Sequence, residues 1–325
     1  MKIKRLSMAI VAVLMLSAIL GAQFVAATSA SETASTSQTT HDYYNNAGYT
    51  EIIGTMGGAN FVIRIPDIWN GMLVVGCRGY SHVFYPNSQF DLDGICFPLI
   101  SGGFAYASSS YGEGGYCIQK AVIRIHQLTE YVVDNYNVLG KVFLIGTSMG
   151  GNVALLLGEK YPDLYSGVLD ICGVKDLKSL YEGAQYVLSL TDEQISALLG
   201  IPIWAVPAYR AFVEDWLADV QIECGGALED KPKAYERISP TYHADITKPV
   251  ISVIGGMDYV VPPEQTEMYQ DAVALAGSSD LYRVYTVPLG GHCDLPVILE
   301  ALSRFGELVL WSFIIGDSVT CTVVA

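Results

Sequence analysis

One serine in the sequence stands between two glycines, in the segment G-T-S-M-G at residues 146–150. The apolar run 142–145 precedes it and a helical pattern over 151–160 follows, which predicts a sharp strand-to-helix turn. In such a turn the backbone at the serine is strained, and the flanking positions must be glycine because a Cβ there would clash. The turn also holds the serine at the amino end of a helix, where negative charge is stabilised. Ser148 is therefore the candidate nucleophile.

A serine hydroxyl is a poor nucleophile at neutral pH and needs a base. Of the five histidines, His292 lies in the glycine-rich segment L-G-G-H-C-D at residues 289–294, directly after the last predicted strand. The sites of α/β proteins form where strands of a parallel sheet end. His292 is therefore the candidate base.

A carboxylate should hold the tautomer of the histidine and stabilise its protonated form. Asp258 follows the apolar run 250–254 and is the preferred candidate. Asp170, near the end of another predicted strand, is a rival, and Asp294 lies too close to His292 in sequence to be the first choice. The resulting chain order, Ser148 then Asp258 then His292, is the order expected of a serine hydrolase triad on an α/β sheet.

A tetrahedral intermediate also needs two hydrogen-bond donors for its oxyanion. The backbone N–H of Met149, directly after the nucleophile, should be one of them. The backbone N–H of Tyr80, in the loop 76–81 after a predicted strand, is the candidate for the other. A plain glycine turn is the alternative interpretation of that loop.

The elements that must position these residues are short apolar runs alternating with helical patterns. Strands are predicted at 61–65, 72–75, 104–107, 142–145, 167–171, 250–254 and 282–287. Helices are predicted at 118–137, 151–160, 263–276 and, in the apolar tail, 308–315. This alternation indicates an α/β fold with a mostly parallel central sheet and helices on both faces.

One long segment, from about residue 174 to 240, breaks the alternation because its pattern is helical without a clear strand. Long insertions in α/β cores commonly cover sites, so we expect a helical lid. The apolar residues around Trp204 and Trp216 would then favour an acyl or aryl group in the substrate. Ordinary helices packed on the edge of the core are the alternative.

Taken together, the motifs resemble the α/β-hydrolase fold from about residue 48 to the C-terminus. The stretch G-T-S-M-G-G-N-V-A-L at 146–155, followed by Y-P-D-L-Y-S-G at 161–167, is similar to the nucleophile region of bacterial esterases and prolyl-oligopeptidase-like hydrolases. The segment K-P-V-I-S-V-I-G-G-M-D at 248–258 resembles the acid loop of that family, and Gly291 with His292 resembles its histidine loop. Many members have His-Gly where this chain has Arg78 and Gly79.

The N-terminus reads as an export signal. A basic start is followed by an almost wholly apolar run from residue 6 to 22 and by small residues at 25–27, the order of a secretory signal peptide. An uncleaved membrane anchor is the alternative. Residues 28–47, rich in Ser and Thr at their start, are expected to be a linker, and residues 48–325 the hydrolase domain. We therefore expect a secreted or surface-exposed protein.

Composition limits the partners. Hydrophobic residues make up 51% of the 325 residues and the formal charge is −15, so a sizeable core is expected and nucleic acid is a poor partner. The seven cysteines show no C-x-x-C pair, and buried free thiols are as compatible with the sequence as two or three disulfides. Scattered histidines predict no metal site, and the expected chemistry needs no cofactor.

The sequence thus predicts an exported serine hydrolase that cleaves small-molecule or polymeric carboxylic esters through an acyl-enzyme. A peptidase or an acyltransferase could use the same triad, since a fold does not decide the substrate. A catalytically silent surface binding protein is a further alternative, but binding alone would not require all three triad residues.

Overall fold

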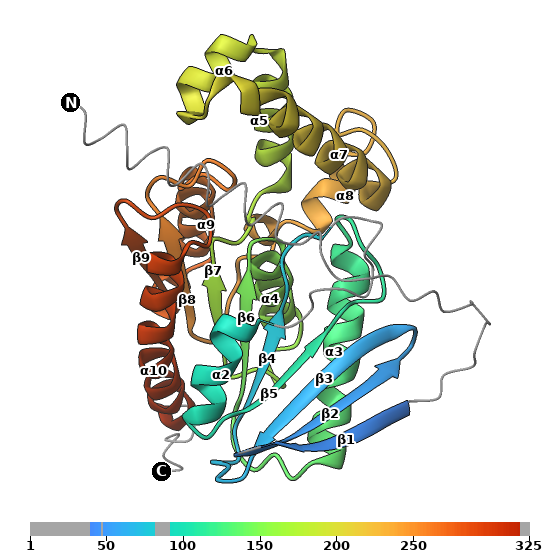
Figure 1. Ribbon diagram of the computed structural model, residues 1–325. Helices are drawn as coiled ribbons and strands as arrows, with labels where there is room; N and C mark the ends of the chain where they lie inside the picture. The colour runs from blue at the N-terminus through green and yellow to red at the C-terminus, as the bar shows by residue number, and fades with distance from the viewer. Residues whose placement is uncertain (1–39, 47, 82–91, 319–325) are drawn as a thin grey trace, which may run out of the picture. The chain divides into compact units, whose positions relative to one another are not determined.

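The computed structural model describes residues 40–46, 48–81 and 92–318. Within them, nine strands form one sheet in the order β1-β2-β3-β5-β4-β6-β7-β8-β9 (Figure 1). The strands are β1 (Thr40–Asn46), β2 (Tyr49–Met56), β3 (Ala59–Pro66), β4 (Leu73–Cys77), β5 (Ala105–Ser109), β6 (Val142–Thr147), β7 (Gly167–Ile171), β8 (Val250–Gly255) and β9 (Tyr282–Val287). Pairing is antiparallel from β1 through β3 to β5 and parallel from β5 to β9. The mostly parallel sheet predicted from the sequence is confirmed.

The strand β1 corrects the predicted linker, because it lies within residues 28–47. It pairs with β2 along its whole length, from Thr40 opposite Thr55 to Asn46 opposite Tyr49. As an edge strand it is held by backbone hydrogen bonds, and the exposure of Tyr43 gives it no buried apolar face. Its composition therefore resembles that of a linker. Neither β1 nor β2 was predicted, whereas β3 to β9 match the seven predicted strands.

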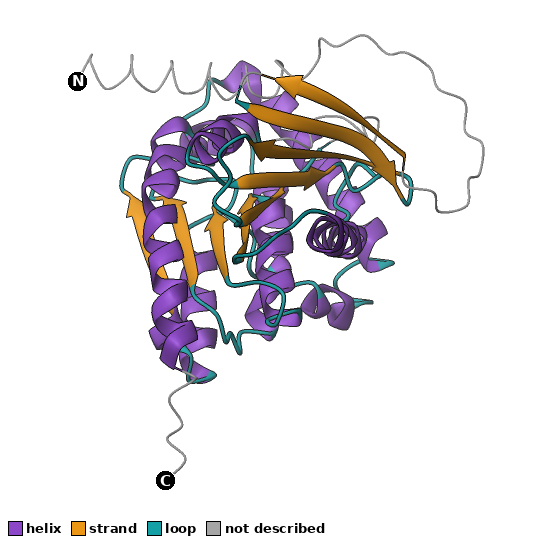
Figure 2. Ribbon diagram, turned by 90° about the horizontal axis from the view of Figure 1, so that it is seen from below, coloured by secondary structure: helices purple, strands orange, loops and turns teal. Residues whose placement is uncertain are grey.

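Helices cover both faces of the sheet (Figure 2). On one face, α2 (Asp93–Ser101) and α10 (Leu295–Ser318) share a hydrophobic core with the central strands; there the ring of Phe305 packs edge-on against that of Phe143 at 5.6 Å. On the other, α3 (Ile118–Asn135) and α4 (Met149–Lys160) pack against each other and against β4 to β7. The helix α9 (Glu264–Leu275) contacts β9.

The connection between β7 and β8 contains helices and no strand over residues 174–240, as predicted. It contains α5 (Leu177–Ser189), α6 (Asp192–Leu199), η2 (Ile203–Ala205), α7 (Val206–Cys224), α8 (Pro232–Arg237) and η3 (Pro240–Tyr242). Of the described residues, Gly183–Leu217 form a compact unit of their own and the rest form a second unit. Inside the small unit, Arg210 donates to the Leu188 carbonyl (2.9 Å) and to Asp192 (2.8 Å). Whether this unit acts as a lid stays a prediction.

The proposed signal segment 1–27 and most of the linker lie outside the described residues. Within the described part of the chain, no single helix is both long and apolar enough to cross a membrane. Only α6 and the helical segment 203–224, taken together as a bent pair, reach the required length and apolar composition. The apolar tail forms the end of α10, in line with the last helix predicted there.

Candidate active site

Ser148 lies at the turn between β6 and α4, where the sequence predicts it. Its φ of 55° and ψ of −122° are rare for a residue with a side chain. A Cβ at Gly146 would come within 2.0 Å of the Gly150 carbonyl oxygen, and one at Gly150 within 2.0 Å of the Cys77 oxygen. Both flanking positions therefore have to be glycine. The Ser148 N–H donates to the Ile171 carbonyl (2.9 Å), which ties the turn to the neighbouring strand β7.

The three predicted triad side chains form one chain of hydrogen bonds. His292 Nε2 lies 2.8 Å from Ser148 Oγ, and His292 Nδ1 lies 2.8 Å from Asp258 Oδ2. The Asp258 side chain is 1% exposed, and its other oxygen accepts the N–H groups of Val260 (2.9 Å) and Val261 (2.8 Å). Because a carboxylate can only accept, the neutral imidazole carries its proton on Nδ1, which leaves Nε2 free to accept from the serine hydroxyl.

The loops that carry the acid and the histidine pack backbone to backbone. The Met257 N–H donates to the Gly290 carbonyl (2.9 Å). A Cβ on Gly255 would lie 2.4 Å from the Gly291 oxygen, so the close approach requires glycine there. The loops after β8 and β9 are thus locked together, and this contact sets the distance between Asp258 and His292.

The rival carboxylates have other roles. Asp170 is buried in an ion pair with Lys175 Nζ (2.7 Å) and accepts from the Ser252 hydroxyl (2.6 Å). Asp294 accepts the N–H of Gly291 (2.7 Å) and so shapes the histidine loop from within. Asp258 is the acid that contacts the histidine.

Four histidines remain, and none is shown to contact the triad. His41 is in the edge strand β1, opposite Gly54. His126, on α3, stacks on the ring of Tyr161 at a centroid distance of 3.7 Å. His243 is exposed and contacts the Arg237 carbonyl (3.1 Å). His82, which follows the loop that carries Tyr80, lies outside the described residues.

Backbone geometry supplies candidates for the oxyanion site. Met149 is the first residue of α4, directly after the nucleophile. Gly79 lies beside the serine, since a Cβ on it would be 3.4 Å from Ser148 Cβ. The Gly79 carbonyl accepts from Arg78 Nη1 (2.9 Å). In a planar trans peptide the C=O and the following N–H point in opposite directions, so this bond fixes the direction of the Tyr80 N–H.

Arg78 is a buried clamp on this loop, with 1% of its surface exposed. Its Nη2 donates to the carbonyls of Ser110 (2.8 Å) and Glu113 (2.6 Å), and its guanidinium lies 4.3 Å from the ring centre of Tyr111. The Tyr111 hydroxyl donates in turn to the Arg78 carbonyl (3.1 Å). Arg78, which stands where many α/β-hydrolases have histidine, thus joins the loop after β4 to the loop after β5. Sequence reasoning did not assign this function to Arg78.

Two cysteines adjoin the triad, and sequence reasoning did not connect them with it. Cys172 follows β7 and Cys293 follows His292; both have positive φ, 50° and 47°. The Cys293 N–H donates to Cys172 Sγ (3.4 Å), and its thiol donates to the Ile171 carbonyl (3.6 Å). The six cysteines that the structure describes are free thiols, whereas Cys321 lies outside the described residues. The sequence did carry a hint of this position, because Cys172 follows the end of a predicted strand and Cys293 follows His292.

These contacts shift the acid–base properties of the site. Burial by itself lowers the pKa of His292, but the hydrogen bonds and charges of Asp258 and Cys172 outweigh it and raise that pKa to about 9. The contact with Cys293 lowers the pKa of the Cys172 thiol to about 6, against the opposing effect of burial. The imidazole is therefore a stronger base than a free histidine.

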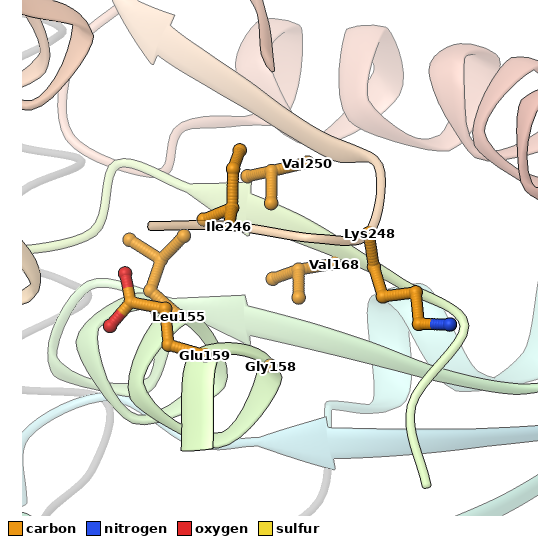
Figure 3. A pocket seen from close by; sticks show the side chains of 7 residues that line it. All are labelled: Leu155, Gly158, Glu159, Val168, Ile246, Lys248 and Val250. Carbon is orange, nitrogen blue, oxygen red and sulfur yellow. The ribbon is translucent and has the colours of Figure 1, made fainter. Parts of the chain in front are cut away.

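Figure 3 shows a separate small pocket, which lies where β7 and β8 begin. Burial raises the pKa of Glu159 well above its usual range, and its carboxyl accepts from the Tyr269 hydroxyl (2.7 Å). The pocket is lined by Leu155, Gly158, Glu159, Val168, Ile246, Lys248 and Val250. No triad residue takes part, so this pocket is not part of the candidate active site.

Comparison with known proteins agrees with the geometry. Residues 115–222, which include the turn at Ser148, match the Esterase family model. No curated protein matches the chain.

Solved structures resemble the whole fold. An esterase from Pyrococcus furiosus superposes with a TM-score of 0.57 and 17% identity, covering 81% of this chain and 90% of that one. Est1E from Butyrivibrio proteoclasticus gives 0.52 and 15%, covering 83% and 99%. The acylaminoacyl peptidase of Pyrococcus horikoshii gives 0.56 and 13%, covering 85% of this chain but 42% of its own. The chain therefore has the α/β-hydrolase fold that the sequence motifs imply.

Proposed function

We propose that the protein is an exported serine hydrolase that cleaves carboxylic esters through an acyl-enzyme. The observation that carries this proposal is the hydrogen-bonded chain from Ser148 through His292 to Asp258, with 2.8 Å at each step. The strained turn at the serine supports it, because a backbone strained at one reactive residue is commonly part of a mechanism. The Esterase match over residues 115–222 supports a hydrolase of the esterase or peptidase type.

Acylation uses the triad as a proton relay. Ser148 Oγ attacks the ester carbonyl carbon while its proton passes to His292 Nε2. Asp258 keeps Nδ1 protonated and stabilises the imidazolium that forms. The N–H groups of Met149 and Tyr80 bind the oxyanion of the tetrahedral intermediate. Collapse of the intermediate breaks the ester C–O bond, and the imidazolium returns its proton to the leaving alcohol.

Deacylation repeats these steps with water. His292 takes a proton from a water molecule, whose oxygen attacks the acyl carbonyl. The second tetrahedral intermediate expels Ser148 Oγ, which regains a proton from the imidazolium. The products are a free carboxylic acid and the original enzyme, so no cofactor enters the reaction.

A peptidase is the second candidate, and one specific observation favours it: an acylaminoacyl peptidase superposes with a TM-score of 0.56, which lies between the 0.57 and 0.52 of the two esterases. The triad would cleave an amide by the same steps. We prefer esters because the matching family model describes esterases. We also propose that the substrate carries an acyl or aryl group, because the helical segment 174–240 presents apolar surface such as Trp204, which is 67% exposed.

The proposals on export and on partners rest on the sequence. The segment 1–27 has the order of a signal peptide, and we propose a secreted or surface location, with membrane attachment only if that segment is not cleaved. The acidic chain is proposed to have a small-molecule or polymeric ester as its substrate and no nucleic-acid partner.

The test compares hydrolysis of aryl esters of increasing acyl length by the wild-type protein and by Ser148→Ala. We expect the variant to fold and to lose several orders of magnitude in turnover. Ser303→Ala removes an exposed hydroxyl on α10 and serves as the matched control. Near-normal turnover by Ser148→Ala would disprove the assignment of the nucleophile. Cleavage of aryl amides at rates equal to those of the esters would favour the peptidase.

A further inference from the structure

Three soft or borderline metal ligands meet beside the triad, although they are far apart in sequence. The ligand atoms of Cys172, His292 and Cys293 all lie within 4.8 Å of one another. In a tetrahedral zinc site, bond lengths of about 2.3 Å to sulfur and 2.0–2.1 Å to nitrogen place the ligands roughly 3.6–3.8 Å apart. Small movements of the three side chains would therefore bring them to coordination distance.

The backbone holds the two thiols toward each other. Cys172 N–H donates to the Val253 carbonyl (3.0 Å), and Cys293 N–H donates to Cys172 Sγ (3.4 Å). Both cysteines adopt a positive φ, which is uncommon for residues other than glycine. The backbone of the loops after β7 and β9 is thus strained at the two cysteines, and both sulfur atoms lie next to the same imidazole.

We propose that Cys172, Cys293 and His292 form a binding site for a thiophilic divalent ion such as Zn²⁺, and that the bound ion inhibits the hydrolase. Two thiolates and an imidazole select zinc-like ions over Mg²⁺ and Ca²⁺. The ion binds the deprotonated forms of its ligands, so any proton that a ligand sulfur or the ligating ring nitrogen carries is released to solvent. The His292 side chain is 17% exposed, so the site is in contact with solvent.

A bound ion would inhibit because both ring nitrogens of His292 take part in the triad. Its Nδ1 contacts Asp258 and its Nε2 contacts Ser148. An ion on Nε2 removes the lone pair that accepts the serine proton, and an ion on Nδ1 removes the hydrogen bond to the acid. Either mode stops the proton relay. The binding of the ion is independent of the proposed function, whereas the inhibition rests on it.

The experiment uses Cd²⁺ as the probe, because thiolate-to-cadmium charge transfer absorbs in the ultraviolet. The full chain, reduced with a phosphine, is titrated with Cd²⁺ as wild type, Ser148→Ala, Cys172→Ala and Cys293→Ala, with Cys224→Ala as a control for a buried thiol outside the site. We expect one equivalent to bind to the wild type, to Ser148→Ala and to the control. Cys172→Ala and Cys293→Ala should each weaken Cd²⁺ binding at least about tenfold. Even the loss of a residue that only hydrogen-bonds to a metal ligand typically lowers metal affinity about 10–100-fold.

Ester hydrolysis is then followed with Zn²⁺, with Mg²⁺ and after addition of a chelator. We expect Zn²⁺ to inhibit, the chelator to restore activity and Mg²⁺ to have no effect. Each cysteine variant should resist Zn²⁺ relative to its own metal-free rate.

No cadmium absorption in the reduced wild type, or full absorption in both cysteine variants, would overturn the site. Binding that leaves the hydrolysis rate unchanged would overturn the inhibition. If no ester is hydrolysed at all, the proposed function fails while the absorption titration still decides the site. Two independent cysteine variants, each checked by circular dichroism, guard against one that does not fold.

Discussion

The candidate active site has two halves that are built differently. The triad half consists of three side chains, Ser148, Asp258 and His292, each in a loop directly after a strand. The proposed oxyanion half consists of the backbone N–H groups of Met149 and Tyr80, and the buried Arg78 sets the direction of the second through the Gly79 carbonyl. Side-chain chemistry is visible in a sequence, whereas the direction of a peptide group depends on contacts from distant residues. The two halves should therefore respond differently to substitution.

The largest effect should come from the acid of the triad half. Asp258→Asn keeps the shape of the side chain but allows its amide to donate to His292, which favours the wrong tautomer. We expect kcat to fall about 10⁴-fold, measured with the aryl ester that gives the highest rate. Asp294→Asn, in the histidine loop, is the matched control and should lose far less. Equal losses in the two variants would show that Asp258 has no special role as the partner of His292.

The second effect should come from the oxyanion half. Arg78→Lys keeps the charge but cannot reach the Gly79, Ser110 and Glu113 carbonyls together, because an ammonium is a single point donor. Loss of one oxyanion donor costs 10²–10³-fold in kcat, so a misdirected Tyr80 N–H should cost about 10–10²-fold.

A purely structural role for Arg78 has to be separated from this one. We therefore compare kcat with KM and measure the affinity for a tetrahedral anionic analogue. If the arginine orients the Tyr80 N–H, kcat and analogue affinity fall together while KM changes little. A lower thermal midpoint with unchanged kcat would assign Arg78 to stability alone.

The same contrast explains how much the sequence could predict. Strands β3 to β9 are apolar runs, and Ser148, Asp258 and His292 stand beside glycines at their ends, so local patterns were enough. The edge strand β1 shows no such pattern, since Tyr43 is 60% exposed and its partner strand alone defines it. The hydrogen bonds of Arg78 and the contact between Cys172 and Cys293 depend on loops that are distant in sequence. Only the folded sheet brings these loops together.

A third prediction concerns the pH dependence that connects the cysteines to the triad. His292 acts as a base only when neutral, and its pKa is raised to about 9, so kcat/KM should rise with pH up to that region. Asp258 and Cys172 raise this pKa, while burial opposes them; Cys293 adjoins the same thiol. Cys172→Ala removes one of the raising contacts, and the acidic limb should move to lower pH.

The measurement is kcat/KM from pH 5 to 10 for the wild type and Cys172→Ala, in the presence of a chelator. Each unit of downward shift makes the neutral imidazole about ten times more abundant below the pKa, so the variant should be several-fold more active at pH 7. An acidic limb at the same pH in both proteins would contradict the contribution of Cys172.

The smallest effect should come from the side chain of Tyr80, and it separates two ways of holding the oxyanion loop. The Tyr80 hydroxyl donates to Asp219 Oδ2 at 2.6 Å, which ties the loop to α7. Arg78 holds the peptide itself, through the Gly79 carbonyl. If the arginine is the main anchor, Tyr80→Phe should lower kcat only about two- to fivefold: a hydrogen bond to a carboxylate contributes about 1.5–3 kcal/mol to stability, but Arg78 still holds the peptide between Gly79 and Tyr80. Steady-state kinetics of Tyr80→Phe, Arg78→Lys and the double variant decide the question, since a loss in Tyr80→Phe as large as that in Arg78→Lys would make the contact with Asp219 the principal support of the oxyanion half.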